Sequence, residues 1–102
     1  MKQILPTKAT GVTQLVQFDF TNQLGTGESL TSGSVGATVY SGVDATPSAI
    51  VSGSATVASP LLEQLVTGGV AGTLYSLVAT TNTSAGQILQ LQAFLAVQGD
   101  PV

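Results

Sequence analysis

The stretch TGGVAGTLYSLVATTNTSAGQ, from Thr67 to Gln87, says most about the fold. It begins with three closely spaced glycines, and glycine accepts backbone angles that other residues avoid, so the chain is predicted to turn sharply there. From Thr73 to Thr80 apolar residues recur with a period of two, which predicts a β-strand. The polar segment Asn82–Gly86 is predicted to be a hairpin loop. The corner glycines are Gly68, Gly69 and Gly72.

The longest predicted strand follows this hairpin, from Gln87 to Val97. Every second side chain is apolar, which gives a clean core-facing row. That row is Leu89, Leu91, Ala93, Leu95 and Val97. The opposite row is Ile88, Gln90, Gln92, Phe94 and Ala96.

The same alternation continues upstream. Val16–Phe20 (VQFDF) reads as a half-buried strand, residues 28–40 as one interrupted strand or a strand pair, and residues 49–57 as a further strand. Within the segment SPLLEQLVT, residues 59–67, the part from 60 to 67 fits either a strand or a short helix that begins at Ser59-Pro60. Residues 1–11 read as a mostly polar arm.

Short strands with turn signals between them predict an all-β fold, an immunoglobulin-like β-sandwich of six or seven antiparallel strands over residues 12–102. In such sandwiches a tyrosine often follows a tight corner, with its ring in the core and its hydroxyl bonded to backbone. Tyr75 stands at that place, after the corner glycines. The alternative is that Tyr75 is an ordinary strand aromatic.

The composition excludes most chemistry. Charged residues make up 7 % of the chain, the net charge is −3, and there is neither histidine nor cysteine. Nucleic-acid binding draws much of its affinity from cationic side chains, and this chain has two, Lys2 and Lys8. No apolar run approaches the roughly 20 residues needed to span a bilayer. We therefore expect no catalysis, no cofactor, no metal, no nucleic acid and no membrane.

The last strand suggests where the protein binds. From Gln87 to Gln98 it has no charge, proline or glycine, the features that normally protect a sheet edge. Either this strand lies centrally in its sheet or another chain covers it. The interface candidates are Ile88, Gln90, Gln92 and Phe94, together with Lys2, Ile4 and Leu5 of the arm, which we expect to become ordered on docking.

Several motifs, in order and spacing, resemble small immunoglobulin-like proteins of tailed bacteriophages, in particular phage fiber–tail adaptor proteins. The resemblance covers residues 16–97. It consists of Phe18-Asp19-Phe20 with Leu24, Gly27-Glu28-Ser29-Leu30, the glycine corner through Tyr75, and Thr83-Ser84-Ala85-Gly86.

The resemblance implies a non-enzymatic structural component of the virion, an adaptor that attaches fibers or other appendages to the tail. Its partners would be other virion proteins, from the tail or the major capsid protein, and copies of itself. Two alternatives remain: a capsid decoration or cement protein, and a carbohydrate-binding module that contacts the host. The sugar-binding alternative requires exposed aromatics, so burial of both Tyr40 and Phe94 would exclude it.

Overall fold

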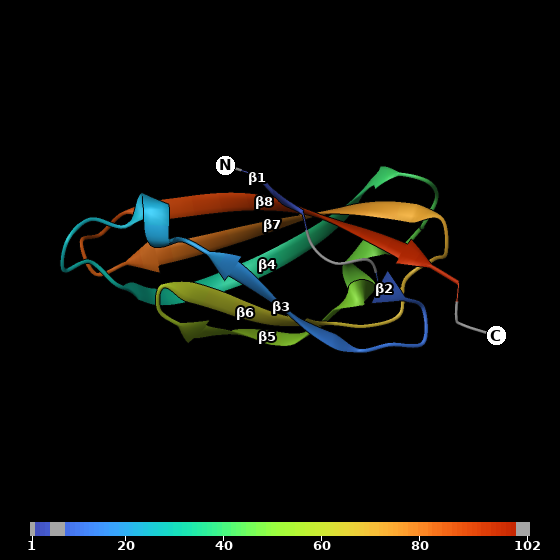
Figure 1. Cartoon of the computed structure of the whole chain (residues 1–102), viewed down its shortest axis with the longest axis horizontal. Helices are drawn as coiled ribbons and strands as arrows, with labels where there is room; N and C mark the ends of the chain where they lie inside the picture. The colour runs from blue at the N-terminus through green and yellow to red at the C-terminus, as the bar shows by residue number, and fades with distance from the viewer. Residues whose placement is uncertain (1, 5–7, 100–102) are drawn as a thin grey trace.

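The computed structural model describes residues 2–4 and 8–99, with side chains from residue 8 onward. Two β-sheets lie face to face along the long axis of a body measuring 47 × 21 × 20 Å (Figure 1). The larger sheet has the order β1-β8-β7-β4, with β2 also on β8, and the smaller has the order β3-β6-β5. The strands are β1 Lys2–Ile4, β2 Lys8–Ala9, β3 Gln14–Asp19, β4 Leu30–Ser41, β5 Val51–Ala58, β6 Leu61–Val66, β7 Thr73–Thr83 and β8 Ile88–Gln98. Two 3-10 turns are η1 Thr21–Gln23 and η2 Pro47–Ile50.

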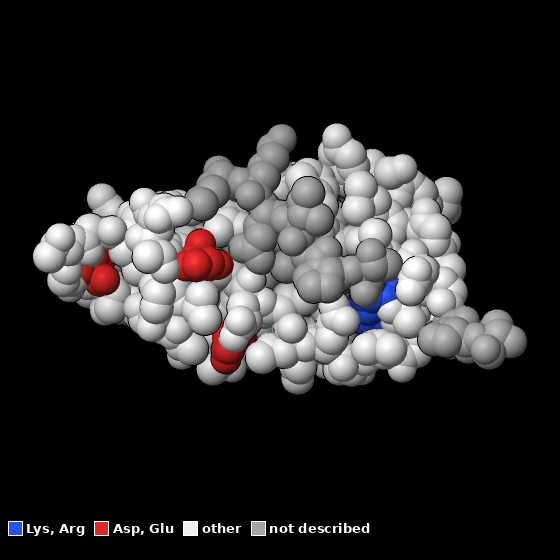
Figure 2. Space-filling model, in the orientation of Figure 1, with Lys and Arg blue, Asp and Glu red and all other residues white. Residues whose placement is uncertain are grey.

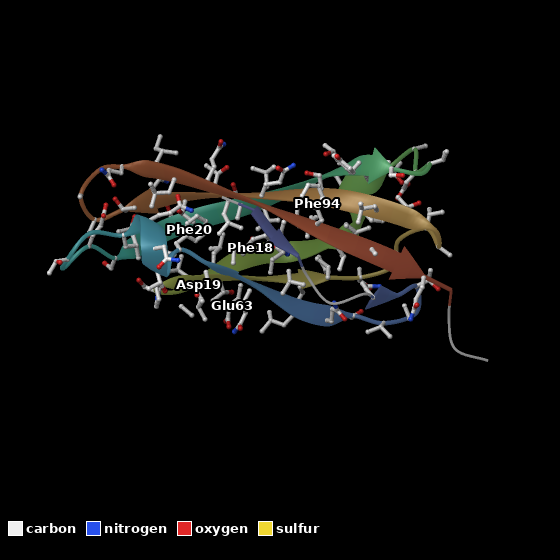
Figure 3. The ribbon with its side chains drawn as sticks, turned by 45° about the horizontal axis from the view of Figure 1, so that its top comes forward. Phe18, Asp19, Phe20, Glu63 and Phe94 are labelled. Atoms are coloured by element: carbon white, nitrogen blue, oxygen red, sulfur yellow. The ribbon has the colours of Figure 1, made fainter. Side chains whose placement is uncertain are left out.

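The core lies between the two sheets. Phe18 and Phe20 from the smaller sheet's side are fully buried against the larger sheet (Figure 3). The row predicted to face the core on β8 does so. Tyr75 and Leu77 of β7 pair with Leu95 and Ala93 of that row, and all four side chains are buried. The all-β sandwich predicted from sequence is confirmed.

The ambiguous segment at residues 60–67 is a strand, and the helix alternative is wrong. In β6 the buried side chains are Leu62, Gln64 and Val66, which is the period of two that a sheet requires. Gln64 is polar, yet its buried Nε2 lies within hydrogen-bond distance of three carbonyl oxygens, those of Ser52, Gly53 and Leu65. It thereby fills the irregularity where the β5–β6 register shifts between Ser52 and Thr56.

Residues 28–40 contain one strand, β4, rather than a pair. Its register with β7 shifts twice, between Leu30 and Ser32 and between Val39 and Ser41. The second shift leaves Tyr40 as an extra residue without a partner on β7, and its ring on the outer side of the sheet meets Phe94.

The predicted arm contains two short strands. β1 pairs with Gln92–Phe94 and β2 with Val97–Gln98, both parallel to β8, whereas β3–β8 form the predicted antiparallel pairs. Pairing of the arm with β8 differs from the expectation that the arm is ordered only on docking. The pairing forms because the open edge of β8 offers backbone donors and acceptors to the arm. The division of the chain at residue 11 stays a prediction.

Lys8, one of the two cations of the predicted arm, is not available for docking. Its side chain is buried, and Nζ donates to the carbonyl oxygens of Ala9 and Gly68, each at 2.7 Å. It ties the arm to the glycine corner. A lysine can be buried in this way when its ammonium donors find acceptors.

Candidate interface on the larger sheet

The outer side of β4, β7 and β8 is an extended surface, which we call the neutral face. These three strands place no charged side chain on it, and serine, threonine and glutamine alternate with a few apolar side chains. Its members are Ser34 and Thr38 of β4, the extra residue Tyr40, Leu74, Ser76, Val78 and Thr80 of β7, and Ile88, Gln90, Gln92, Phe94 and Ala96 of β8.

Neutral hydrogen bonds hold the side chains of this face in place. Gln92 Nε2 donates to Ser76 Oγ at 2.8 Å, and Gln90 Nε2 donates to Thr80 Oγ1 at 3.3 Å. Each bond joins β8 to β7. The carboxamide oxygens of both glutamines are acceptors that a docked protein can use, so the face is suited to hydrogen bonding with little ordering cost.

Apolar groups stand at both ends of the neutral face. At one end the rings of Tyr40 and Phe94 meet edge to face with centroids 4.9 Å apart. At the other end Ile88 is 70 % exposed. Large exposed apolar side chains are typical anchors of protein interfaces, with aromatic residues enriched among them. Tyr40 is 65 % exposed and Phe94 half-buried, so the condition that would exclude sugar binding is not met.

The open edge of β8 is partly covered by the chain itself. Within the described residues, β1 and β2 cover residues 92–94 and 97–98, and no strand pairs with the outer edge of residues 88–91. Of the predicted arm contacts, Lys2 and Ile4 belong to β1, but their side chains lie outside the described part, as does the whole of Leu5. Their part in an interface stays a prediction.

The glycine corner and Tyr75 form one hydrogen-bonded unit. Gly68, Gly69 and Gly72 have φ of 63°, 99° and 82°. At Gly69 a Cβ would also lie 3.0 Å from the Val97 side chain. Both the positive φ and this close contact therefore disfavour a side chain at Gly69. Tyr75 is buried; its Oη accepts from the Val70 N–H at 2.8 Å and donates to Asp44 Oδ2 at 2.6 Å.

Asp44 is a residue that sequence reasoning missed. Its Oδ1 accepts from the Thr46 N–H at 2.9 Å, so the carboxylate joins its own loop to the corner. Only this local turn has a signal in the sequence, an acidic residue two positions before a threonine. The contact with Tyr75, distant in the chain, has none.

Tyr75→Phe should lower the free energy of unfolding by about 1–3 kcal/mol, because it leaves the Val70 N–H and the Asp44 carboxylate without their shared hydroxyl. Chemical denaturation measures this. Tyr40→Phe, which removes the same group from an exposed ring, is the control and should change stability little. An unchanged denaturation midpoint for Tyr75→Phe would show that the Tyr75 hydroxyl adds no stability and that the ring contributes by packing alone.

Three carboxylates are held in their charged form by hydrogen bonds. The pKa of Asp19 is lowered by Thr21, that of Glu28 by the Gly25 N–H and Thr83, and that of Asp44 by Tyr75 and Thr46. Burial and the bond to Asp44 raise the pKa of the Tyr75 hydroxyl. None of the three acids lies on the neutral face.

The lowered carboxylate pKa values predict loss of stability in acid. A group whose pKa is lowered on folding stabilises the protein above its unfolded value and stops doing so as the pH falls through its folded value. The thermal midpoint should therefore stay constant from pH 7 to about 5. It should decline as the pH falls below the ordinary carboxyl pKa values, 4.5 for glutamate and 3.8 for aspartate. Asp44→Asn should show a smaller decline. An equal decline in Asp44→Asn and in the wild type would show that Asp44 does not contribute to the loss of stability in acid.

The described residues contain no group of three or more histidine, cysteine, aspartate or glutamate side chains that could hold a metal ion. No helix in this part of the chain is long and apolar enough to cross a membrane.

Comparison with known protein families gives one result. The family model described as podophage GP4 fiber-tail adaptor protein gp77 matches residues 8–96. No curated protein matches the chain. The matched segment runs from β2 almost to the end of β8, so it includes both sheets, the glycine corner and the neutral face.

Proposed function

Since the chain belongs to the podophage GP4 fiber-tail adaptor family, and is therefore a structural component of the virion, we propose that it attaches fibers or other appendages to the tail body. It does so by subunit–subunit contacts, and the neutral face makes one of these contacts. Its partners are other virion proteins.

The observation that carries the proposal is the absence of charge from an exposed, partly apolar sheet face. Covering a charged surface costs free energy unless every ion finds a partner. A partner that docks on the neutral face covers Ile88 and Tyr40 and removes their apolar surface from water, which favours binding. It desolvates no charged side chain among the described residues of this face. The hydrogen-bonding glutamines then fix its orientation.

Repetition strengthens such an attachment. Tails are symmetric, and copies held around one axis convert modest single contacts into firm binding. This action is binding without catalysis. The chain has no histidine or cysteine, so an acid–base or nucleophilic site would have to be built from other groups.

One observation favours a second candidate, a carbohydrate-binding surface. Tyr40 presents an exposed ring beside Phe94, with the exposed hydroxyl-bearing Thr38 on the same face. Sugars stack on such rings. Tyr40→Ala should then abolish binding to host-surface glycans in a binding assay, whereas an adaptor that contacts proteins alone gives no glycan binding in either form.

The test of the proposed function is the number of copies in each particle, counted by quantitative mass spectrometry of purified virions. An adaptor at the tail gives on the order of a dozen copies, as expected for an axial symmetric ring. Hundreds of copies would identify a capsid decoration or cement protein and contradict the proposal.

A further inference from the structure

The smaller sheet also has an outer face, and it differs in character from the neutral face. Near one end of the β3–β6 pairing, Leu15 of β3 pairs directly with Leu65 of β6. These leucines are 51 % and 44 % exposed, although a leucine in a sheet normally faces the core. Directly opposed residues have Cβ atoms about 5 Å apart, so the two side chains form one apolar patch.

Two carboxylates lie on the same face, both on one side of this patch along the strands. The next outward-facing pair along the strands is Gln17 with Glu63, and the one after it is Asp19 with Leu61. Figure 3 shows Asp19 and Glu63 near one another, on the side of β3 and β6 away from Phe18 and Phe20. Figure 2 shows the acidic groups as small separate areas on a surface that otherwise has almost no charge.

Both carboxylates are fixed in position and keep an oxygen available. Glu63 Oε2 accepts from Gln17 Nε2 at 2.6 Å, and Asp19 Oδ1 accepts from the Thr21 N–H at 2.9 Å. These contacts leave Glu63 Oε1 and Asp19 Oδ2 for an incoming donor. The lysine whose side chain the structure describes, Lys8, is buried and bonded to carbonyl oxygens elsewhere. The face is therefore negative.

We propose that this leucine–carboxylate face, made of Leu15, Leu65, Asp19 and Glu63, is a second docking surface. Its occupant is a protein segment that presents an aliphatic or aromatic side chain flanked by lysine or arginine. Charge complementarity selects this chemistry: the leucines accept an apolar anchor, and the two fixed carboxylates accept cations at its side. The inference rests on the proposed function, because an adaptor must hold two partners at once, and the two outer faces differ in charge.

Ionic strength separates the two faces. Attraction between exposed opposite charges weakens with salt, whereas burial of apolar and neutral groups does not. The partner on the leucine–carboxylate face should thus bind in a salt-dependent way, and the partner on the neutral face should not.

The experiment measures binding of the full chain to two probes, the purified fibers and the fiber-free tail body of the phage, at about 50 and 500 mM NaCl. One probe should lose about five-fold or more in affinity at the higher salt, since two charge contacts are screened. The variant Asp19→Asn/Glu63→Gln should remove most of that dependence. Leu65→Ser should weaken binding of the same probe about ten-fold at both salt concentrations.

Controls assign the effects to the face. Glu28→Gln removes one negative charge at the hairpin end of the molecule and should leave the salt dependence unchanged. Ile88→Ser truncates an exposed side chain of the neutral face and should weaken the other probe alone. Thermal midpoints close to that of the wild type establish that each variant is folded.

Failure of the inference and failure of the proposed function look different. If both probes bind and neither the Leu65 nor the carboxylate variants change either affinity, the adaptor function stands and the leucine–carboxylate face is not a docking surface. If the folded wild-type chain binds neither fibers nor tail body, the proposed function fails and this inference fails with it.

Discussion

Gly42→Ala is expected to lower the free energy of unfolding by about 4 kcal/mol, from backbone strain and crowding together. Gly42 has φ of 106°, where residues with a Cβ are strained. A Cβ there would also lie 2.9 Å from Thr73 Cα and 3.2 Å from the Gly72 carbonyl oxygen. Both are backbone atoms at the start of β7, so neither moves without disturbing the corner.

Gly36→Ala is the matched control for this prediction. Gly36 lies in β4, the strand that precedes Gly42, with nothing within 4 Å of an added Cβ and no positive φ. Its replacement should change stability by less than about 1 kcal/mol. Denaturant titration of both variants measures the difference. Equal midpoints for the two would contradict the tight packing of the loop after β4 against the corner.

Gln90→Glu is expected to weaken docking onto adaptor-free tails by about 100-fold or more, because it buries an unpaired charge in the contact. The substitution keeps the shape of the side chain. Gln90 lies at the β8 end of a row across the neutral face, opposite Thr80, which in turn pairs with Ser34. Binding of labelled protein to tails purified from a deletion mutant measures the effect.

Ser54→Glu adds the same charge at an exposed position of β5 in the other sheet. It should bind tails as well as the wild type, so a loss with Gln90→Glu alone assigns the effect to the neutral face. Equal affinities of the wild type and both variants would show that the row through Gln90 is not in the contact.

The sequence alone was sufficient for β3, β7 and β8 and for the direction of most of their side chains. In β3, β7 and β8 every second residue is apolar, and a sheet turns that alternation directly into a buried and an exposed side. The segment that became β6 was ambiguous because Leu61 and Leu62 are adjacent and a proline precedes them, which also suits the first turn of a helix.

What the sequence could not predict depends on contacts between distant segments. Lys8 reads as a surface cation in a polar arm, and only the position of the Gly68 carbonyl explains its burial. The alternation in β4 places Tyr40 on the outer side, but that Phe94 is its neighbour follows only from the sheet order and register. The candidate interface residues Ile88, Gln90, Gln92 and Phe94 were found from one strand, whereas their neighbours on β7 and β4 required the sheet order.

A cryo-electron-microscopy reconstruction of the intact tail, at side-chain detail, tests the central claim most directly. The account predicts this chain at the junction of fiber and tail body, with Ile88 and Tyr40 covered by a neighbouring virion protein. A reconstruction in which the neutral face of every copy points into solvent would contradict it.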